Sequence, residues 1–234
     1  TIQQNYGESI DKGLVSSQLP KIDQKTFLDV LDDIEINANS VLNLNVADAD
    51  LLATNNVEHS DFGYEISDEA GPIQGEINSG SDIGVLADAT SVNVNGGGSL
   101  VMSVAEYSAL TTDTDLNAQF SISDTREAIQ NAVNDMVPAV TAASTITVED
   151  SGRIQLDGSD FGAFSGKISA ASIELKDSVS GLNSISEHVH EDVLVIAQAQ
   201  SGEDLTTSAH FLANVDQIVL DGASNVTVDA AQVL

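Results

Sequence analysis

The chain of 234 residues has no cysteine and no tryptophan, and its basic residues are scarce. The lack of cysteine excludes disulfides, thiolate metal sites and cysteine nucleophiles. Lys and Arg number 7 against 37 Asp and Glu, so the formal net charge is −30 at pH 7. Such a field repels phosphate backbones and anionic headgroups, and we expect neither nucleic acid nor a membrane surface as a partner.

Long apolar runs are missing as well. The longest, residues 193–197, is far shorter than the roughly 18 residues that a membrane-spanning helix needs. The first thirty residues lack the basic segment and the apolar core of a secretory signal. We therefore expect no membrane insertion, and a chain that has been processed or excised from a longer one.

The residues that are present favour thin layers of strands. Hydrophobic residues make up 41% of the chain, with 6 Phe and 3 Tyr among them. This content is sufficient for a core, and the small branched side chains favour stacked strands over a bulky centre. Salt or divalent cations can neutralise the acidic surface, which suits a saline or calcium-containing exterior; solubility alone is the alternative.

One motif occurs four times without a gap. Its copies are 58, 54 and 72 residues apart and start at Ile34, Val92, Ile146 and Ile218. Apolar residues alternate on both sides of a short polar gap, as in Val92/Val94 and Leu100/Met102. The gaps read NANSV, NGGGS, EDSGR and DGASN, and they are rich in turn-forming residues. The pattern predicts two short strands joined by a tight reversal or a corner.

A second motif lies between these copies. It reads YEISDEAGPIQ, FSISDTREAIQ and IELKDSVSGLN, and its copies start at Tyr64, Phe120 and Ile173. In each copy a short alternating strand ends at an aspartate, namely Asp68, Asp124 and Asp177. An apolar rhythm such as Ala128/Ile129 and Ala132/Val133 follows the second of them. We expect a short helix or loop there, capped by the aspartate.

Together the motifs define a unit of about 55 residues, and such units rarely bury their faces alone. The predicted fold is mainly β with short helices, a repeat-built β-solenoid-like array over residues 34–234. Its units start near residues 34, 92, 146 and 218. Residues 1–33 match neither motif clearly and are expected to form an N-terminal cap, a partial repeat or an assembly arm. Open strand edges would permit association between copies.

Two segments carry a family resemblance. FSISDTREAIQNAV (120–133) and STITVEDSGRIQLDGSDF (144–161) resemble the degenerate repeat of large exported bacterial surface proteins. That repeat occurs in type I secreted adhesins, repeats-in-toxin relatives and surface-layer-like proteins. The resemblance implies a secreted protein at the cell surface or in the matrix, with a structural or adhesive role. The family's Ala-x-Gln element is clear only at Ala230–Gln232, and the glycine-rich calcium nonapeptide is missing.

Three aspartates near the third copy of the first motif are candidate Ca²⁺ ligands. Asp150, Asp157 and Asp160 lie in EDSGRIQLDGSDFG, and clustered carboxylates with backbone carbonyls suit this hard cation. The spacing does not match an EF-hand. Ordinary turn aspartates are the alternative interpretation.

The segment EHVHED contains two histidines at strand spacing. His188 and His190 would point to one face, with carboxylates nearby, as a transition-metal site requires. No third ligand is identifiable. The alternative is a polar surface stretch that enters the apolar strand VLVIAQ.

We expect no enzymatic activity, because neither a nucleophile elbow nor a phosphate loop occurs and no carboxylate pair stands out. The expected role is an extracellular scaffold of a surface layer, filament or matrix. It would self-associate end to end or edge to edge, with Ca²⁺ as the candidate ion. One alternative is a glycan-binding segment of a large adhesin, with Tyr107 and Phe161 as aromatic candidates. Another is a secreted polysaccharide-active enzyme on a solenoid scaffold.

Overall fold

The computed structural model describes residues 41–54, 63–80, 83–185, 189–200, 215–220 and 222. Of these residues, 37% are helical and 32% lie in strands. The prediction of a mainly β, solenoid-like array is wrong, because the chain is an α/β protein with parallel sheets. The physical reason is the strand direction: parallel neighbours need crossover connections, and helices form them here. The predicted N-terminal element at 1–33 and the first strand of the first motif copy lie outside the described residues.

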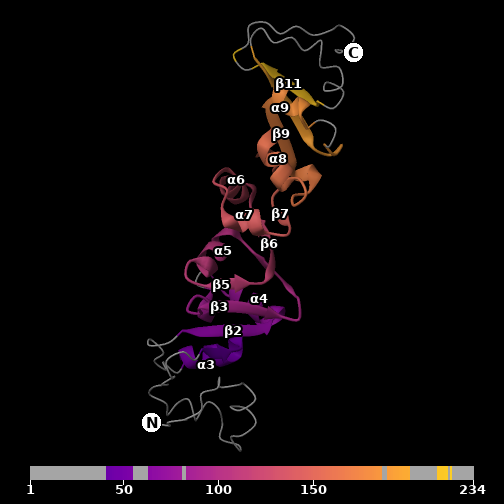
Figure 1. Ribbon diagram of the computed structural model, residues 1–234. Coiled ribbons are helices and arrows are strands. Elements are labelled where there is room, and N and C mark those ends of the chain that lie inside the picture. Colours follow the sequence, from indigo (N-terminus) through magenta and orange to yellow (C-terminus); the bar gives the residue numbers. More distant parts are fainter. Residues whose placement is uncertain are drawn as a thin grey trace, which may run out of the picture. The chain divides into compact units, whose positions relative to one another are not determined.

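The chain divides into two compact units, unit 1 (Thr1–Ser121) and unit 2 (Ile122–Leu234). Unit 1 alternates strands and short helices (Figure 1). Its strands are β1 (Leu42–Leu44), β2 (Tyr64–Glu69), β3 (Ser91–Asn95), β4 (Ser99–Met102) and β5 (Asp115–Asn117). Its helices are α3 (Val46–Thr54), α4 (Ala70–Ile77), the 3-10 turn η1 (Gly84–Leu86) and α5 (Val104–Thr111). Strand β6 (Gln119–Asp124) crosses the boundary between the units.

Unit 2 continues with the same alternation. Its strands are β7 (Ile146–Val148), β8 (Ile154–Leu156), β9 (Ile173–Ser178), β10 (Leu194–Ala199) and β11 (Gln217–Leu220). Its helices are α6 (Arg126–Asn134), α7 (Pro138–Ala142), α8 (Gly158–Phe164), the 3-10 turn η2 (Ala170–Ser172) and α9 (Val179–Asn183). The strands predicted within the described residues and the helix predicted after Asp124 are therefore confirmed. The second strand of the fourth motif copy lies outside the described residues.

The strands form three sheets, in the orders β1-β2-β3-β5, β4-β6-β7 and β11-β10-β9-β8. In unit 1, Ile66 is in register with Val92, and Val92 with Leu116. In unit 2, Leu175 is in register with both Leu156 and Val195. Apolar side chains thus stack on apolar side chains from strand to strand, which aligns one apolar row in each of these two sheets.

The two strands of the first motif are joined by a corner and not by a hairpin. β3 and β4 belong to different sheets, and so do β7 and β8. In the first of these corners Gly96 and Gly97 both have φ of +75°, a conformation that side chains other than glycine rarely adopt. The NGGGS sequence therefore redirects the chain from one sheet into the next.

Each second-motif strand leads into a helix, but the predicted capping residue was wrong by one position. The N-caps of α6 and α9 are Thr125 and Ser178, whose hydroxyls accept hydrogen bonds from the third residue of each helix. The preceding Asp124 and Asp177 instead accept from the backbone N–H groups of these caps. The short hydroxyl side chains reach the helix N–H groups, while each aspartate orders the backbone that enters the helix.

Helices α3, α5 and α8 follow the second strand of the first three first-motif copies and were not predicted. Their N-caps occupy one aligned position: Asn45, Ser103 and Asp157 each accept a hydrogen bond from a backbone N–H of the helix that follows. Ser103 and Glu106 form a complete capping box, and this Ser-x-x-Glu pattern is a recognisable signal in the sequence.

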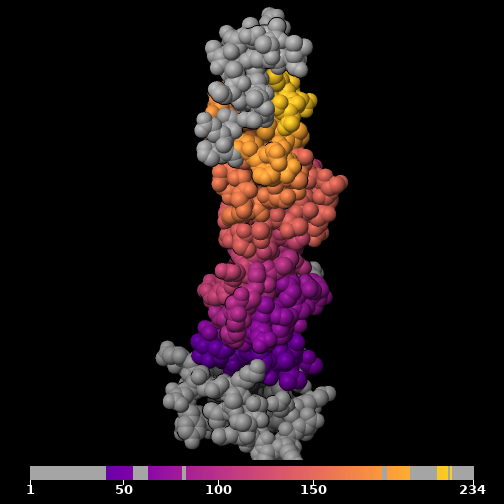
Figure 2. Space-filling view, turned by 90° about the vertical axis from the view of Figure 1, so that its right-hand side faces the viewer, coloured from indigo at the N-terminus to yellow at the C-terminus, as the bar shows by residue number. Residues whose placement is uncertain are grey.

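The core contains aliphatic side chains of both units. Ile66, Val92 and Leu100 are fully buried in unit 1, as are Ile154 and Leu175 in unit 2. Burial raises the pKa of Tyr64, with the charges of Asp88 and Asp50 contributing, so its neutral hydroxyl donates to the Val85 carbonyl at 2.7 Å. On the face shown in Figure 2, the described residues of neither unit surround a deep hollow.

Candidate functional site

Two of the three candidate calcium ligands, Asp150 and Asp157, bind backbone N–H groups. Asp157 caps α8: its Oδ1 accepts from the N–H of Ser159 at 2.8 Å, the N–H of Asp160 at 2.9 Å and the Ser159 hydroxyl at 2.6 Å. Asp150 lies in the β7–β8 corner, where its Oδ1 accepts from the N–H groups of Arg126 and Gly152. Two of the three carboxylates therefore already bind backbone donors.

The pKa values of the two α8 aspartates move in opposite directions. The hydrogen bond from the Ser159 hydroxyl, followed by that from the Asp160 N–H, lowers the pKa of Asp157. Desolvation raises the pKa of Asp160, and the neighbouring Asp157 charge adds to this effect. The hydrogen bonds thus favour the ionised form of Asp157, whereas desolvation disfavours that of Asp160. In the described part of the chain, no group of three or more His, Asp or Glu side chains is arranged to hold a metal ion.

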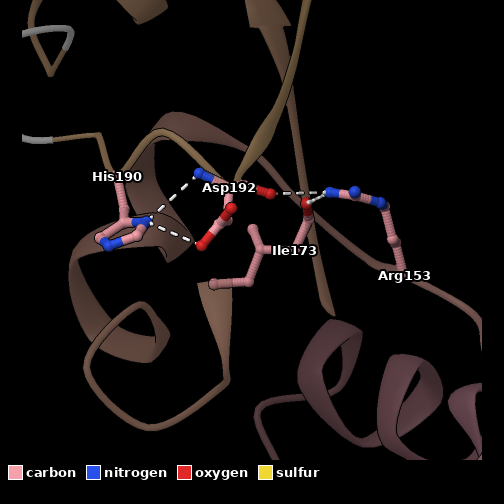
Figure 3. A network of polar contacts seen from close by, with 4 residues as sticks. All are labelled: Arg153, Ile173, His190 and Asp192. Carbon is pink, nitrogen blue, oxygen red and sulfur yellow. Dashed lines mark hydrogen bonds and ion pairs between the residues drawn. The ribbon is translucent and has the colours of Figure 1, made fainter. Parts of the chain in front are cut away.

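The histidine segment contributes to a network of backbone contacts (Figure 3). His190 Nδ1 lies 3.5 Å from the Asp192 carboxylate and accepts from the Asp192 N–H at 3.2 Å. Both side chains are more than half exposed, so the pair adds little stability. The predicted second histidine ligand, His188, lies outside the described residues.

Arg153 joins three segments of unit 2 in the same network. One of its terminal nitrogens donates to the carbonyls of Ile173, at 2.9 Å, and Asp192, at 3.1 Å. The guanidinium therefore connects the loop before β8, the start of β9 and the loop before β10 (Figure 3). This function of the arginine is structural, and sequence analysis did not single it out.

The two aromatic candidates for glycan stacking are engaged within unit 1 and unit 2, respectively. The ring of Tyr107 lies 4.8 Å from the ring of Phe120, centroid to centroid. Phe161 is buried on α8 with 5% of its surface exposed. Phe161 therefore does not offer an open aromatic face to a sugar.

A shallow depression in unit 1 contains a set of polar contacts between a helix and a strand. It is lined by Ala70, Gly71, Gln74, Asn78, Ser99 and Val101, between α4 and β4. The Gln74 amide donates to the Val101 carbonyl at 2.7 Å and accepts from the Val101 N–H at 2.7 Å. It also donates to Asn78 at 2.9 Å. We call this set of three residues the unit 1 amide bridge.

The same arrangement recurs in unit 2. Gln130 of α6 donates to the Gln155 carbonyl at 3.0 Å and accepts from the Gln155 N–H at 2.7 Å. It also donates to Asn134 at 3.0 Å. These residues form the unit 2 amide bridge. One side-chain amide in each unit therefore takes both backbone hydrogen bonds of a strand residue, as a neighbouring strand would.

The sequence contained a signal for the amide bridges that was not used. Gln74 and Gln130 are the last residues of the aligned segments YEISDEAGPIQ and FSISDTREAIQ, and Asn183 is the last residue of the third. Polar residues at the end of an apolar helical rhythm are usually solvated. Only the tertiary structure reveals that the first two of these amides reach a strand.

A third recurring contact links neighbouring strands. The Ser67 hydroxyl donates to Asn95 in unit 1, and the Ser123 hydroxyl donates to Glu149 in unit 2. Aspartates also join successive segments, because Asp68 accepts from the first N–H of α3 and Asp177 from the first N–H of α8. The polar groups in these contacts bind other parts of the chain.

No protein-family model, curated protein or solved structure matched this chain. The resemblance to exported repeat proteins therefore depends on its motifs alone. None of the helices in the described segments has the length and apolar character that crossing a membrane requires.

Proposed function

We propose that this chain is a structural repeat segment of a secreted bacterial surface layer, filament or large adhesin. Its role is mechanical: it connects and spaces other parts of an extracellular assembly and associates with copies of itself. No catalytic step is part of the proposal. The proposal combines the family resemblance with the recurrence of one set of contacts in two successive units.

The recurrence is the observation that carries the proposal. The amide bridges, the serine contacts between strands and the aligned helix caps use residues 54 to 58 positions apart, as in Gln74 and Gln130 or Asn45 and Ser103. A chain that repeats its internal contacts distributes them over similar units, two of which lie in the described part of this chain. Repeat proteins of this kind are extended by adding further units, which suits a stalk or a layer.

The net charge of −30 supports an extracellular setting and sets the conditions for association. At low ionic strength, copies of this chain repel one another, whereas salt or divalent cations reduce that repulsion. We propose that Ca²⁺ promotes contacts between copies by neutralising carboxylates on facing surfaces.

Electron microscopy and sedimentation velocity of the purified chain test this proposal. Samples with millimolar Ca²⁺ are compared with samples in NaCl of equal ionic strength, so that specific binding is separated from screening. Ordered filaments or sheets in either sample would support self-assembly, and their restriction to Ca²⁺ would assign the ion to the contacts. Monomers under both conditions would refute self-assembly and direct the work to glycan-binding assays.

A further inference from the structure

The outer edges of two strands are closed by side chains and not by strands. Among the described strands, β4 and β8 are each the last member of their sheet on one side. An edge strand exposes unpaired N–H and C=O groups that can pair with a strand from another molecule. In this protein the amide bridges occupy Val101 in β4 and Gln155 in β8.

Each amide bridge makes the two hydrogen bonds that a neighbouring strand would make to one residue. Both backbone groups of Val101 bond to Gln74 at 2.7 Å, and those of Gln155 bond to Gln130 at 2.7 and 3.0 Å. The two edges are only three or four residues long, so one occupied residue near the centre interrupts the row of free groups. A pairing strand would have to displace the glutamine amide first.

Each glutamine is held in position by its helix. Gln74 and Gln130 also donate to Asn78 and Asn134, each four residues further along the same helix. The close packing of helix and corner supports this placement, since a methyl group on Gly98 would lie 2.5 Å from the Ala70 Cβ. In unit 2, Gly152 has the same relation to Arg126. The helix therefore starts directly against the corner, and its glutamine reaches the strand edge one turn later.

We infer that Gln74 and Gln130 guard the β4 and β8 edges against strand addition by a second copy of this chain. The occupant in question is a second copy because the guarded edge of unit 1 also presents an apolar side chain, Val101, which is 49% exposed. Hydrogen-bonding groups beside an exposed apolar side chain are the features that lead to edge-to-edge pairing of identical molecules. This inference does not depend on the proposed function, because it concerns association that the glutamines prevent.

The test compares the wild-type chain with the double variant Gln74→Ala/Gln130→Ala, and Gln119→Ala, at an exposed position of β6, is the matched control. Amide hydrogen exchange is measured at Val101 and Gln155, and sedimentation velocity is measured over a range of protein concentrations. The buffer contains about 0.5 M NaCl, so that the net charge does not mask association. We expect exchange of these two amides to accelerate about two- to tenfold in the double variant. We also expect concentration-dependent dimers and larger species, and neither effect in the control.

Two results would overturn the inference. Unchanged exchange at Val101 and Gln155 would mean that the amide bridges do not protect these groups. Faster amide exchange without association of the double variant would mean that the glutamines do not prevent strand addition at these edges. If the double variant does not fold, Gln74→Asn and Gln130→Asn provide the same test, because they retain the amide and shorten its reach by one methylene group. A wild-type chain that never assembles would refute the proposed function and leave this comparison unaffected.

Discussion

The two units share the contact between a helix and a strand edge, but they differ in the residues that form the corner between two strands. The helix-to-strand contacts are conserved between them, since Gln74 and Gln130 bind the middle of β4 and β8 in the same manner. At the corner, however, unit 1 has Gly96 with φ of +75°, whereas unit 2 has Asp150 at the aligned position. Asp150 accepts from the first N–H of α6, a contact that a glycine cannot make.

The difference between the two corners separates the contacts that both units contain from those that only one unit contains. The contact between the strand edge and the helix amide is present in both units. The corner only has to change the chain direction, and positive-φ glycines or a hydrogen-bonded aspartate can achieve this. Four pairs of aligned positions allow the comparison to be tested.

The largest effect is expected in the buried layers. Leu100 and Ile154 are aligned and fully buried, so Leu100→Ala and Ile154→Ala should each lower the free energy of unfolding by about 2–5 kcal/mol. Denaturant titration measures this loss. The adjacent Val101→Ala, at a 49% exposed position, is the control and should change stability by less than about 0.5 kcal/mol. A Leu100→Ala cost no greater than that of the control would mean that this layer does not support the fold.

The aligned glycines at the corners should differ in their tolerance of a methyl group. Gly98→Ala would place a Cβ 2.5 Å from the Ala70 Cβ, which cannot rotate away, and we expect a loss of about 1–3 kcal/mol. Gly152→Ala would meet the Arg126 side chain, whose outer atoms can move, and should cost less. Thermal unfolding of both variants gives the comparison. In the double variant Ala70→Gly/Gly98→Ala the clash is removed, and part of the stability should return.

Arg153 in unit 2 is aligned with Ser99 in unit 1. The variant Arg153→Ser therefore places the unit 1 residue in unit 2. Arg153→Ser removes the bridge between the Ile173 and Asp192 carbonyls and should cost about 1.5 kcal/mol, the lower value for charged hydrogen bonds. Arg153→Lys keeps the charge but replaces the planar guanidinium by an ammonium group on a shorter side chain, so it should recover only part of this loss. Complete recovery by lysine would show that charge, and not geometry, makes the contribution.

The smallest effect concerns the aligned helix caps, Ser103 and Asp157. Replacement of either by alanine should cost about 1 kcal/mol at neutral pH. The two losses should differ in pH dependence. Because the pKa of Asp157 is lowered in the folded chain, its contribution is present above the unfolded pKa of about 3.9 and disappears as the pH falls through the folded value.

Urea titrations between neutral and acidic pH measure this difference. The stability difference between wild type and Asp157→Ala should shrink on acidification, whereas that for Ser103→Ala should stay constant. The variant Asp157→Ser should also retain its cap at low pH. A pH-independent loss for Asp157→Ala would contradict the role of the ionised carboxylate.

Local pattern was sufficient to place most strands and some of the helices. Alternating residues such as Val92/Val94 and Ile146/Val148 do lie in strands, and the apolar rhythm through Ile129 and Val133 is a helix with both residues buried. Helix α5 was missed because its apolar pattern is short and only the Ser103–Glu106 capping box marks its start. Capping signals in eight-residue helices are easily outweighed by the strand pattern that precedes them.

The sequence by itself determined the positions of most strands, the turn-rich corners and the repetition of both, because these depend on contacts between near neighbours. Only the tertiary structure decided the parallel direction, the assignment of β3 and β4 to different sheets and the partners of Gln74 and Gln130. These features join residues about 20 or more positions apart, as Ile66 with Val92 or Gln130 with Gln155. Such pairings depend on which segments can bury their apolar faces together. The alternation of apolar and polar residues along one strand does not reveal them, because it is the same for a parallel and an antiparallel neighbour and for any partner strand.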